Sequence, residues 1–218
     1  MDRKFKRPKN KAELEQLEAE GLWKAIALTK KIGESKEKIT LSTILRIHRV
    51  IFEYAVPEDA GRFRRGGEDV KKLKCTEPPP GRLVQERMYL FARELDTLLS
   101  KTPLHINSNS KTHKRKWTSD VFDLAAWIQY QVVAIHPFCD GNGRLARLMT
   151  NLVLRRYGFH ASQVKIESEN KPAYLDKLCQ IDKHQDYEPL KKLIISSVIE
   201  TMKKEENLRK IKQSQKKY

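Results

Sequence analysis

The chain has 218 residues, 39% of them hydrophobic and 33% charged, and 44 Lys and Arg against 28 Asp and Glu give a net charge of +16. This length allows one domain with a substantial core. No apolar run is long enough to cross a membrane, and Met1 to Lys4 leads into no apolar signal core, so we expect no membrane association and a cytoplasmic location.

The three cysteines, Cys75, Cys139 and Cys179, are odd in number and widely spaced. This pattern is unlike a disulfide framework or a zinc cluster, which need cysteines in pairs or in short groups. We therefore expect neither, and a reducing compartment.

Apolar residues recur at helical spacing along most of the chain, and this pattern predicts an all-α fold. The first helix is expected over 12–31, with Gly33 as its stop. Thr40 is expected to cap a second helix, which Pro57 ends. His48 lies on the apolar face of that helix, and we interpret it as a core residue.

The next segment, 62–75, predicts a small hairpin, because Gly66 and Gly67 lie at its centre between short β-compatible flanks. A helix over 83–99 follows. The basic segment 111–116 lies in a polar stretch, which favours a mobile surface loop over a contact surface.

Further helices are expected over 121–135, over 145–157, from Pro172 through Leu178, and along the stripe Leu190, Leu193, Ile194 and Val198. The tryptophans Trp23, Trp117 and Trp127 are interpreted as packing residues. Basic, polar ends such as 203–218 are commonly solvated or frayed. The chain therefore divides into an N-terminal helix (1–38), a central helical domain (39–202) and a basic C-terminal tail (203–218).

The most informative stretch is 136–148, His-Pro-Phe-Cys-Asp-Gly-Asn-Gly-Arg-Leu-Ala-Arg-Leu. The ordinary pKa of histidine lies near neutrality, so His136 is able to take a proton from a hydroxyl. Asp140 offers the hard oxygen ligand that Mg²⁺ prefers.

The residues after Asp140 suit a bound anion. Glycine lets the backbone approach a phosphate closely, and successive N–H groups at a helix start form an anion-binding concavity. Arg144 and Arg147 are three residues apart, so they are neighbours on the first turns of that helix and offer planar donors. Each feature alone is commonly structural, whereas the combination predicts a site that binds a polyphosphate and transfers part of it.

This stretch resembles the signature of Fic-domain proteins, His-Pro-Phe-x-Asp-Gly-Asn-Gly-Arg-x-x-Arg, at every defining position. The resemblance extends over about 41–202, through Ala60-Gly61-Arg62-Phe63-Arg64 and Pro78-Pro79-Pro80. It implies an all-α Fic-domain helical bundle with a small β-hairpin flap next to the active site.

The resemblance also implies a protein adenylyltransferase, which transfers AMP from ATP to a Ser, Thr or Tyr hydroxyl of a target protein docked at the flap, about 62–80. His136 would act as the general base and Asp140 as the Mg²⁺ ligand. The phosphate-binding residues would be Gly141, Asn142 with its side chain, Gly143, Arg144 and Arg147. Pro137 and Phe138 are expected to be structural, and Cys139 has no expected role.

Many Fic proteins carry an inhibitory helix with Ser or Thr, three residues, then Glu followed by Gly or Asn. Its glutamate pairs with the second motif arginine and blocks the γ-phosphate. Here Glu20-Gly21 matches the end of that pattern, Gln16 replaces the Ser or Thr, and Glu18 is a second candidate. We expect Glu20 to pair with Arg147 and to inhibit the enzyme.

Basic residues of the predicted hairpin, Arg64, Arg65, Lys71, Lys72 and Lys74, predict an acidic or polar target segment. Two alternatives to adenylyl transfer to a protein remain. One is a Fic enzyme that uses another nucleotide or removes AMP. The other is a basic nucleic-acid-binding or adaptor module, which the net charge alone suggests; it gives no reason for His136, Asp140 and both arginines to occur together, so a specific nucleic-acid partner is not expected.

Overall fold

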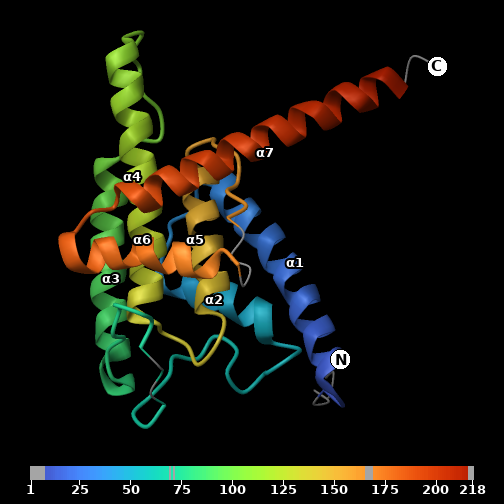
Figure 1. Cartoon of the computed structure of the whole chain (residues 1–218), viewed down its shortest axis with the longest axis vertical. Helices are drawn as coiled ribbons and strands as arrows, with labels where there is room; N and C mark the ends of the chain where they lie inside the picture. The colour runs from blue at the N-terminus through green and yellow to red at the C-terminus, as the bar shows by residue number, and fades with distance from the viewer. Residues whose placement is uncertain (1–7, 69, 71, 165–168, 216–218) are drawn as a thin grey trace.

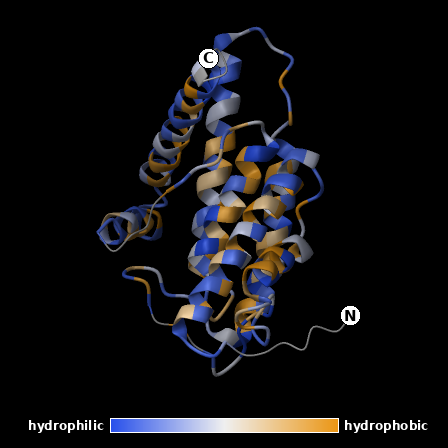
Figure 2. Cartoon of the chain, turned by 90° about the vertical axis from the view of Figure 1, so that its right-hand side faces the viewer, coloured by the Kyte–Doolittle hydropathy of each residue, from blue (hydrophilic) through white to orange (hydrophobic). Residues whose placement is uncertain are grey.

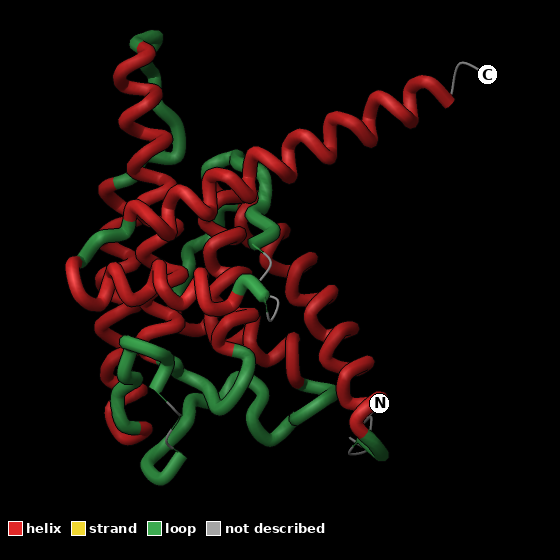
Figure 3. The backbone as a smooth tube through the Cα atoms, viewed as in Figure 1, coloured by secondary structure: helices red, strands yellow, loops and turns green. Residues whose placement is uncertain are grey.

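The computed structural model describes residues 8–68, 70, 72–164 and 169–215. Within this part the elements are α1 (Lys11–Ser35), α2 (Leu41–Phe52), a 3-10 turn η1 (Gly81–Leu83), α3 (Val84–Lys101), α4 (Lys111–Ile135), α5 (Asn142–Arg156), α6 (Lys171–His184) and α7 (Glu188–Gln215). Figure 3 shows these helices connected by loops, without a β-sheet. The prediction of an all-α fold is confirmed.

Helices α4 and α5 form the centre of the bundle, where α5 packs against both α4 and α1 (Figure 1). Fully buried residues of this centre are Ile128, Val132, Leu145, Met149 and Leu152. Figure 2 shows hydrophobic residues concentrated inside the bundle and hydrophilic ones outside. The loop between α4 and α5 is therefore held at both ends by the core.

Helix α1 lies against α2 and α5. The Asn10 side chain caps its start by accepting the Glu13 N–H (2.9 Å), and the helix continues to Ser35, two residues past Gly33. Gly21 brings α1 close to α2, because a Cβ atom there would lie 2.0 Å from the Ile51 carbonyl oxygen. This close approach sets the side of α1 that faces the site.

The basic segment 111–116 is helical, so the prediction of a mobile loop was wrong. Ser110 accepts the His113 N–H (3.5 Å) at the start of α4, and Lys116 pairs with Asp120 one turn later (2.9 Å). Figure 1 shows the first turns of α4 projecting beyond the bundle. A solvated helical turn has no apolar stripe, and for this reason its sequence resembles that of a loop.

Helix α7 continues past residue 202, so residues 203–215 of the expected tail are helical, and they extend away from the bundle (Figure 1). Trp23 does not pack as predicted, since it is 72% exposed. Trp117 and Trp127 do pack, against Phe159 and Phe91 respectively. No helix in the described ranges combines the length and apolarity needed to span a membrane.

We call residues 62–80 the flap segment. Its described residues contain turns and one isolated antiparallel bridge, Leu73 with Thr76, instead of strands flanking Gly66 and Gly67. Lys71 lies outside the described residues. The segment is held against α6 by a side-chain hydrogen bond, in which Thr76 Oγ1 donates to Asp182 Oδ2 (2.5 Å).

A disulfide joins Cys75 of the flap segment to Cys179 of α6 across 104 residues of sequence. The expectation of no disulfide was therefore wrong, because cysteine spacing does not show which residues meet after folding. Cys139 is a free, exposed thiol. The cysteine pattern consequently no longer supports the expected reducing compartment.

Candidate active site

The motif forms the junction between the two central helices. His136 ends α4 with a left-handed backbone (φ 49°, ψ 60°), and its N–H donates to the Val132 carbonyl (3.1 Å). Gly141 is also left-handed (φ 79°), and a Cβ atom there would lie 2.3 Å from the Phe52 ring. Glycine is therefore required at the start of α5.

Phe138 and Asn142 hold the loop from inside. Phe138 is fully buried, stacks on His48 with ring centroids 3.6 Å apart, and contacts Phe63 at 5.3 Å. The Asn142 side chain accepts the Phe138 N–H (3.0 Å) and donates to the Phe138 carbonyl (2.8 Å). This side chain therefore closes the loop, a role that the sequence did not predict; its predicted contact with a phosphate stays a prediction.

His48 is buried, as predicted, and joins two loops of the site. Its Nδ1 accepts the Gly61 N–H (3.0 Å), so its Nε2 carries the proton and donates to the Asp140 carbonyl (3.1 Å). Burial lowers the pKa of His48 to about 4, and the positive charge of Arg144 contributes to the decrease. The folded protein therefore holds the His48 ring in its neutral form at pH 7.

Replacing His48 with glutamine should remove a pH dependence of stability. Between pH 6.5 and 4 the unfolded chain protonates His48 and the folded chain does not, so the stabilisation present above pH 6.5 is lost as the pH falls. At pH 5 this loss is about 2 kcal/mol. Urea unfolding at pH 7 and pH 5 should show a larger decrease for the wild type than for His48→Gln by this amount; equal decreases would contradict the assignment.

Arg64 is almost entirely buried, although the sequence predicted it as one of the basic residues that the hairpin offers to a target. Its side chain donates to the His136 carbonyl (2.7 Å), the Ile135 carbonyl (3.3 Å) and the Pro79 carbonyl. It therefore contacts the loop of residues 136–141, which we call the catalytic loop, and the far end of the flap segment at once. The family-like stretch noted in the sequence ends at Arg64, but nothing in the sequence showed that this residue is buried while the neighbouring Arg65 is exposed.

His136 has the electrostatics of a base. Burial lowers the pKa of its ring and the Arg64 charge adds to the decrease, while a hydrogen bond with Val133 and the Asp140 charge oppose it. The ring is consequently neutral at pH 7 and able to accept a proton.

The N-terminus of α5 and two arginines offer donors suited to an anion. The first N–H groups of a helix have no acceptor within the helix, and here they belong to Asn142, Gly143 and Arg144. Arg147 is partly buried, and burial lowers the pKa of its guanidinium despite the nearby Tyr174 hydroxyl. A bound phosphate would supply the negative charge that this buried cation favours.

Asp140 lies at the mouth of this site, with 76% of its side chain exposed. Its Oδ1 accepts the Gly141 N–H (2.5 Å), and its Oδ2 accepts from Arg144 (3.1 Å). Among the described residues no group of three carboxylate, histidine or cysteine side chains is placed to hold a metal ion. One exposed carboxylate next to a phosphate site nevertheless fits Mg²⁺, which commonly combines one or two carboxylates with phosphate oxygens.

Glu18, and not Glu20, reaches a motif arginine. Arg144 Nη1 donates to Glu18 Oε2 (2.6 Å), and both side chains are only 22% exposed. Glu20 is exposed and accepts from the Gln16 side chain (3.0 Å). The pair therefore involves the first motif arginine and the second of the two candidate glutamates.

Three basic residues of the described part of the flap segment are paired with carboxylates. Arg62 pairs with both Asp59 (2.5 Å) and Glu68 (2.9 Å). Lys74 pairs with Asp176, and Lys72 lies 3.8 Å from Glu77. With Arg64 buried as well, the basis for predicting an acidic target segment is largely removed.

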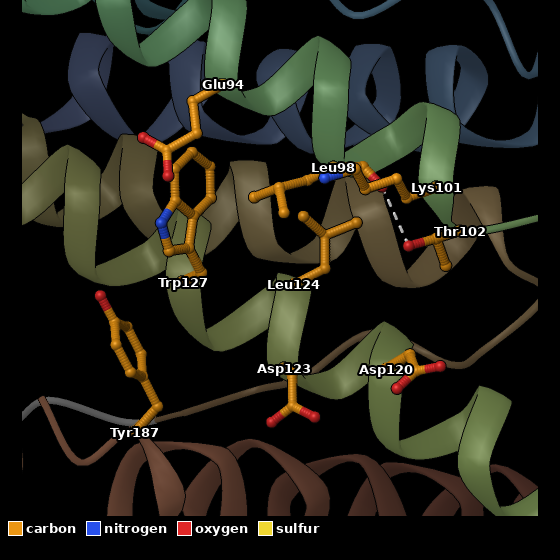
Figure 4. A pocket seen from close by; sticks show the side chains of 9 residues that line it. All are labelled: Glu94, Leu98, Lys101, Thr102, Asp120, Asp123, Leu124, Trp127 and Tyr187. Carbon is orange, nitrogen blue, oxygen red and sulfur yellow. Dashed lines mark hydrogen bonds between the residues drawn. The ribbon is translucent and has the colours of Figure 1, made fainter.

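A cavity of about 440 Å³ lies between α3, α4 and the start of α7, away from the motif (Figure 4). Leu98, Leu124 and Trp127 line it, together with the carboxylates of Glu94, Asp120 and Asp123. Carboxylates outnumber cations in this lining, which disfavours a phosphate. The motif therefore remains the candidate for the active site.

Comparisons with known proteins identify the family to which this chain belongs. The sequence profile of the Fic/DOC family matches residues 38–154. The chain is 33% identical over 180 residues to a protein adenylyltransferase Fic of Nematostella vectensis, covering 82% of this chain and 37% of that protein. With the same-named protein of Aedes aegypti it shares 31% identity over 164 residues, which is 75% of this chain and 28% of the relative.

The solved structure of Fic-1 (residues 134–508) from C. elegans resembles this chain with a TM-score of 0.69 and 25% identity, covering 91% of this chain and 53% of that one. The chain spans about a third of the length of the curated relatives described above. The profile covers more than half of the chain, including α2, α3, α4, the whole loop between α4 and α5, and α5 as far as residue 154. The chain therefore belongs to the Fic/DOC family.

Proposed function

We propose that the chain is a protein adenylyltransferase that uses ATP and Mg²⁺. The observation that carries this proposal is the arrangement around the start of α5, where a partly buried, neutral His136, an exposed Asp140 and two arginines surround one candidate anion site. The names of the two curated relatives support the same activity.

In this proposal a target hydroxyl held at the flap segment gives its proton to the His136 ring as its oxygen attacks the α-phosphorus of ATP. The bond from the α-phosphorus to the oxygen bridging it to the β-phosphorus breaks, and pyrophosphate leaves. Arg144, Arg147 and the first N–H groups of α5 stabilise the charge on the phosphates. Mg²⁺, held by Asp140, would neutralise charge on the phosphate oxygens when it is bound.

The experiment that tests this function is label transfer from ATP to protein. The chain is incubated with ATP labelled at the α-phosphate, with Mg²⁺ or with a chelator, and modification of the chain itself is measured. Label is expected with Mg²⁺ and is expected to disappear with the chelator. Label transferred from γ-labelled ATP instead would identify a phosphotransferase and contradict the proposal.

Glu18 is proposed as the inhibitory residue in place of Glu20. Its carboxylate occupies the Arg144 guanidinium, which lies over the Phe52 ring (4.6 Å) and has only limited freedom to bind a phosphate elsewhere. A phosphate must therefore compete with Glu18 for the same donors.

Replacing Glu18 with alanine should increase the apparent affinity for ATP by roughly 10- to 100-fold, because a partly buried charged hydrogen bond no longer competes. Glu20→Ala is the matched control, two residues away on the same helix, and should leave the affinity unchanged. The ATP dependence of label transfer measures both. Activation by Glu20→Ala alone would show that the inhibitory residue has been misassigned.

A further inference from the structure

We propose that Arg64 is a positioning residue that fixes the backbone of His136 relative to the flap segment. The inference rests on the proposed function, in which the flap segment presents the target hydroxyl and His136 removes its proton. Arg64 lies outside the motif, and in this inference it sets the distance between the His136 ring and the target hydroxyl.

The first argument is the end of α4. The last carbonyls of a helix accept no hydrogen bond from within the helix, so they need N–H donors from elsewhere. Arg64 Nε donates to the His136 carbonyl (2.7 Å), and its Nη2 donates to the Ile135 carbonyl (3.3 Å). A guanidinium at this position also faces the negative end of the α4 dipole. The left-handed backbone of His136 is thereby held from its carbonyl side.

The second argument is the base of the flap segment. Arg64 Nη2 also donates to the Pro79 carbonyl, and the Arg64 N–H donates to the Pro137 carbonyl (3.0 Å). At the same place a Cβ atom on Gly81 would lie 1.8 Å from the Arg65 carbonyl oxygen. The two ends of the flap segment therefore lie side by side, and one side chain joins them to the catalytic loop.

The third argument is the chemistry of arginine. A guanidinium presents several N–H groups in a fixed plane, so it is able to contact three carbonyls of two chain segments at once. A lysine ammonium keeps the charge and loses the planar arrangement. Arg65, the next residue, is exposed and has the same charge, which makes it a matched control.

The experiment compares Arg64→Met, Arg64→Lys and Arg65→Met in the full chain. The rate of label transfer at saturating ATP and the affinity for ATP are measured separately. Arg64→Met should lower the rate by about 100-fold, as expected for a misplaced reacting group. The affinity for ATP should stay within about threefold, because the Arg64 side chain donates to the carbonyls of Ile135, His136 and Pro79, whereas the phosphates are assigned to Arg144, Arg147 and the start of α5. Arg65→Met, which removes an exposed charge from the same segment, should lower the rate less than Arg64→Met does and should leave the affinity for ATP unchanged.

A second measurement does not depend on activity. NMR titration of the His136 ring, identified by its loss in His136→Ala, reports the pKa of that ring. The charged groups that act on it are Arg64 from the base of the flap segment and Asp140 from the loop after it. Arg64→Met should raise this pKa by removing a nearby positive charge, whereas Arg64→Lys and Arg65→Met should leave it unchanged.

The outcomes separate the two proposals. A wild-type rate in folded Arg64→Met overturns the inference. If Arg64→Met does not fold, Arg64→Lys decides: a rate lowered about tenfold with the His136 pKa unchanged supports the inference, and a full rate overturns it. If the wild type transfers no label while Arg64→Met still raises the His136 pKa, the proposed function is overturned and the link from Arg64 to His136 is supported.

Discussion

Replacing His136 with alanine should reduce label transfer by roughly 10²- to 10⁴-fold, the usual contribution of a general base. The reason is specific to this ring, since burial and Arg64 both lower its pKa and keep it neutral and ready to accept a proton at pH 7. The affinity for ATP should change little, because the phosphates are assigned to Arg144, Arg147 and the start of α5.

The control for this prediction is His184→Ala at the exposed end of α6, which should transfer label at the wild-type rate. Calorimetric titration with ATP distinguishes a lost base from a lost binding site. Label transfer by His136→Ala within about threefold of the wild type would contradict the role of His136, since that change corresponds to less than 1 kcal/mol of transition-state stabilisation.

Replacing Phe138 with alanine should destabilise the fold by about 3–5 kcal/mol, the usual cost of removing a buried phenyl ring. Phe138 is fully buried and stacks on His48, so its loss removes one of the contacts between the catalytic loop and α2. The free energy of unfolding in urea measures this effect at pH 7.

Tyr89→Ala is the control for the Phe138 variant, since Tyr89 lies on α3 and is 59% exposed. Its effect should stay within about 0.5 kcal/mol. If Phe138→Ala lowers the free energy of unfolding by less than about 1 kcal/mol, the catalytic loop must relax into the space left by the ring. The stacking on His48 would then not be needed to hold that loop.

The two side chains next to Arg144 and His136 suggest how the site is regulated and kept in shape. Glu18 belongs to α1, which lies outside the profile match at residues 38–154. In the proposed function, its pairing with Arg144 makes the affinity for a nucleotide depend on how α1 is docked. Arg64, by contrast, belongs to the flap segment and is proposed to hold the backbone of His136. Nucleotide binding and proton removal would therefore depend on different side chains from different elements.

The helices could be predicted from the sequence because their apolar residues recur at helical spacing, and a buried stripe is a local signal. The motif could be predicted because its residue types and their order are contiguous, so His136, Asp140, Arg144 and Arg147 are placed together by the chain itself. Neither prediction needed knowledge of which distant segments meet. The first turns of α4 and the end of α7 were missed because they are solvated and lack an apolar stripe.

The sequence by itself therefore determined the fold class and the position of the loop between α4 and α5, and it supplied the residues that are proposed to bind the anion. Only the tertiary structure decided which glutamate reaches an arginine: residues two apart on a helix point about 200° apart, and the close contact of Gly21 with Ile51 orients α1 so that Glu18 faces Arg144. It likewise decided the Cys75–Cys179 disulfide and the position of Arg64 under His136, because both join segments about 70 to 100 residues apart. Such contacts depend on packing between elements, which no local pattern records.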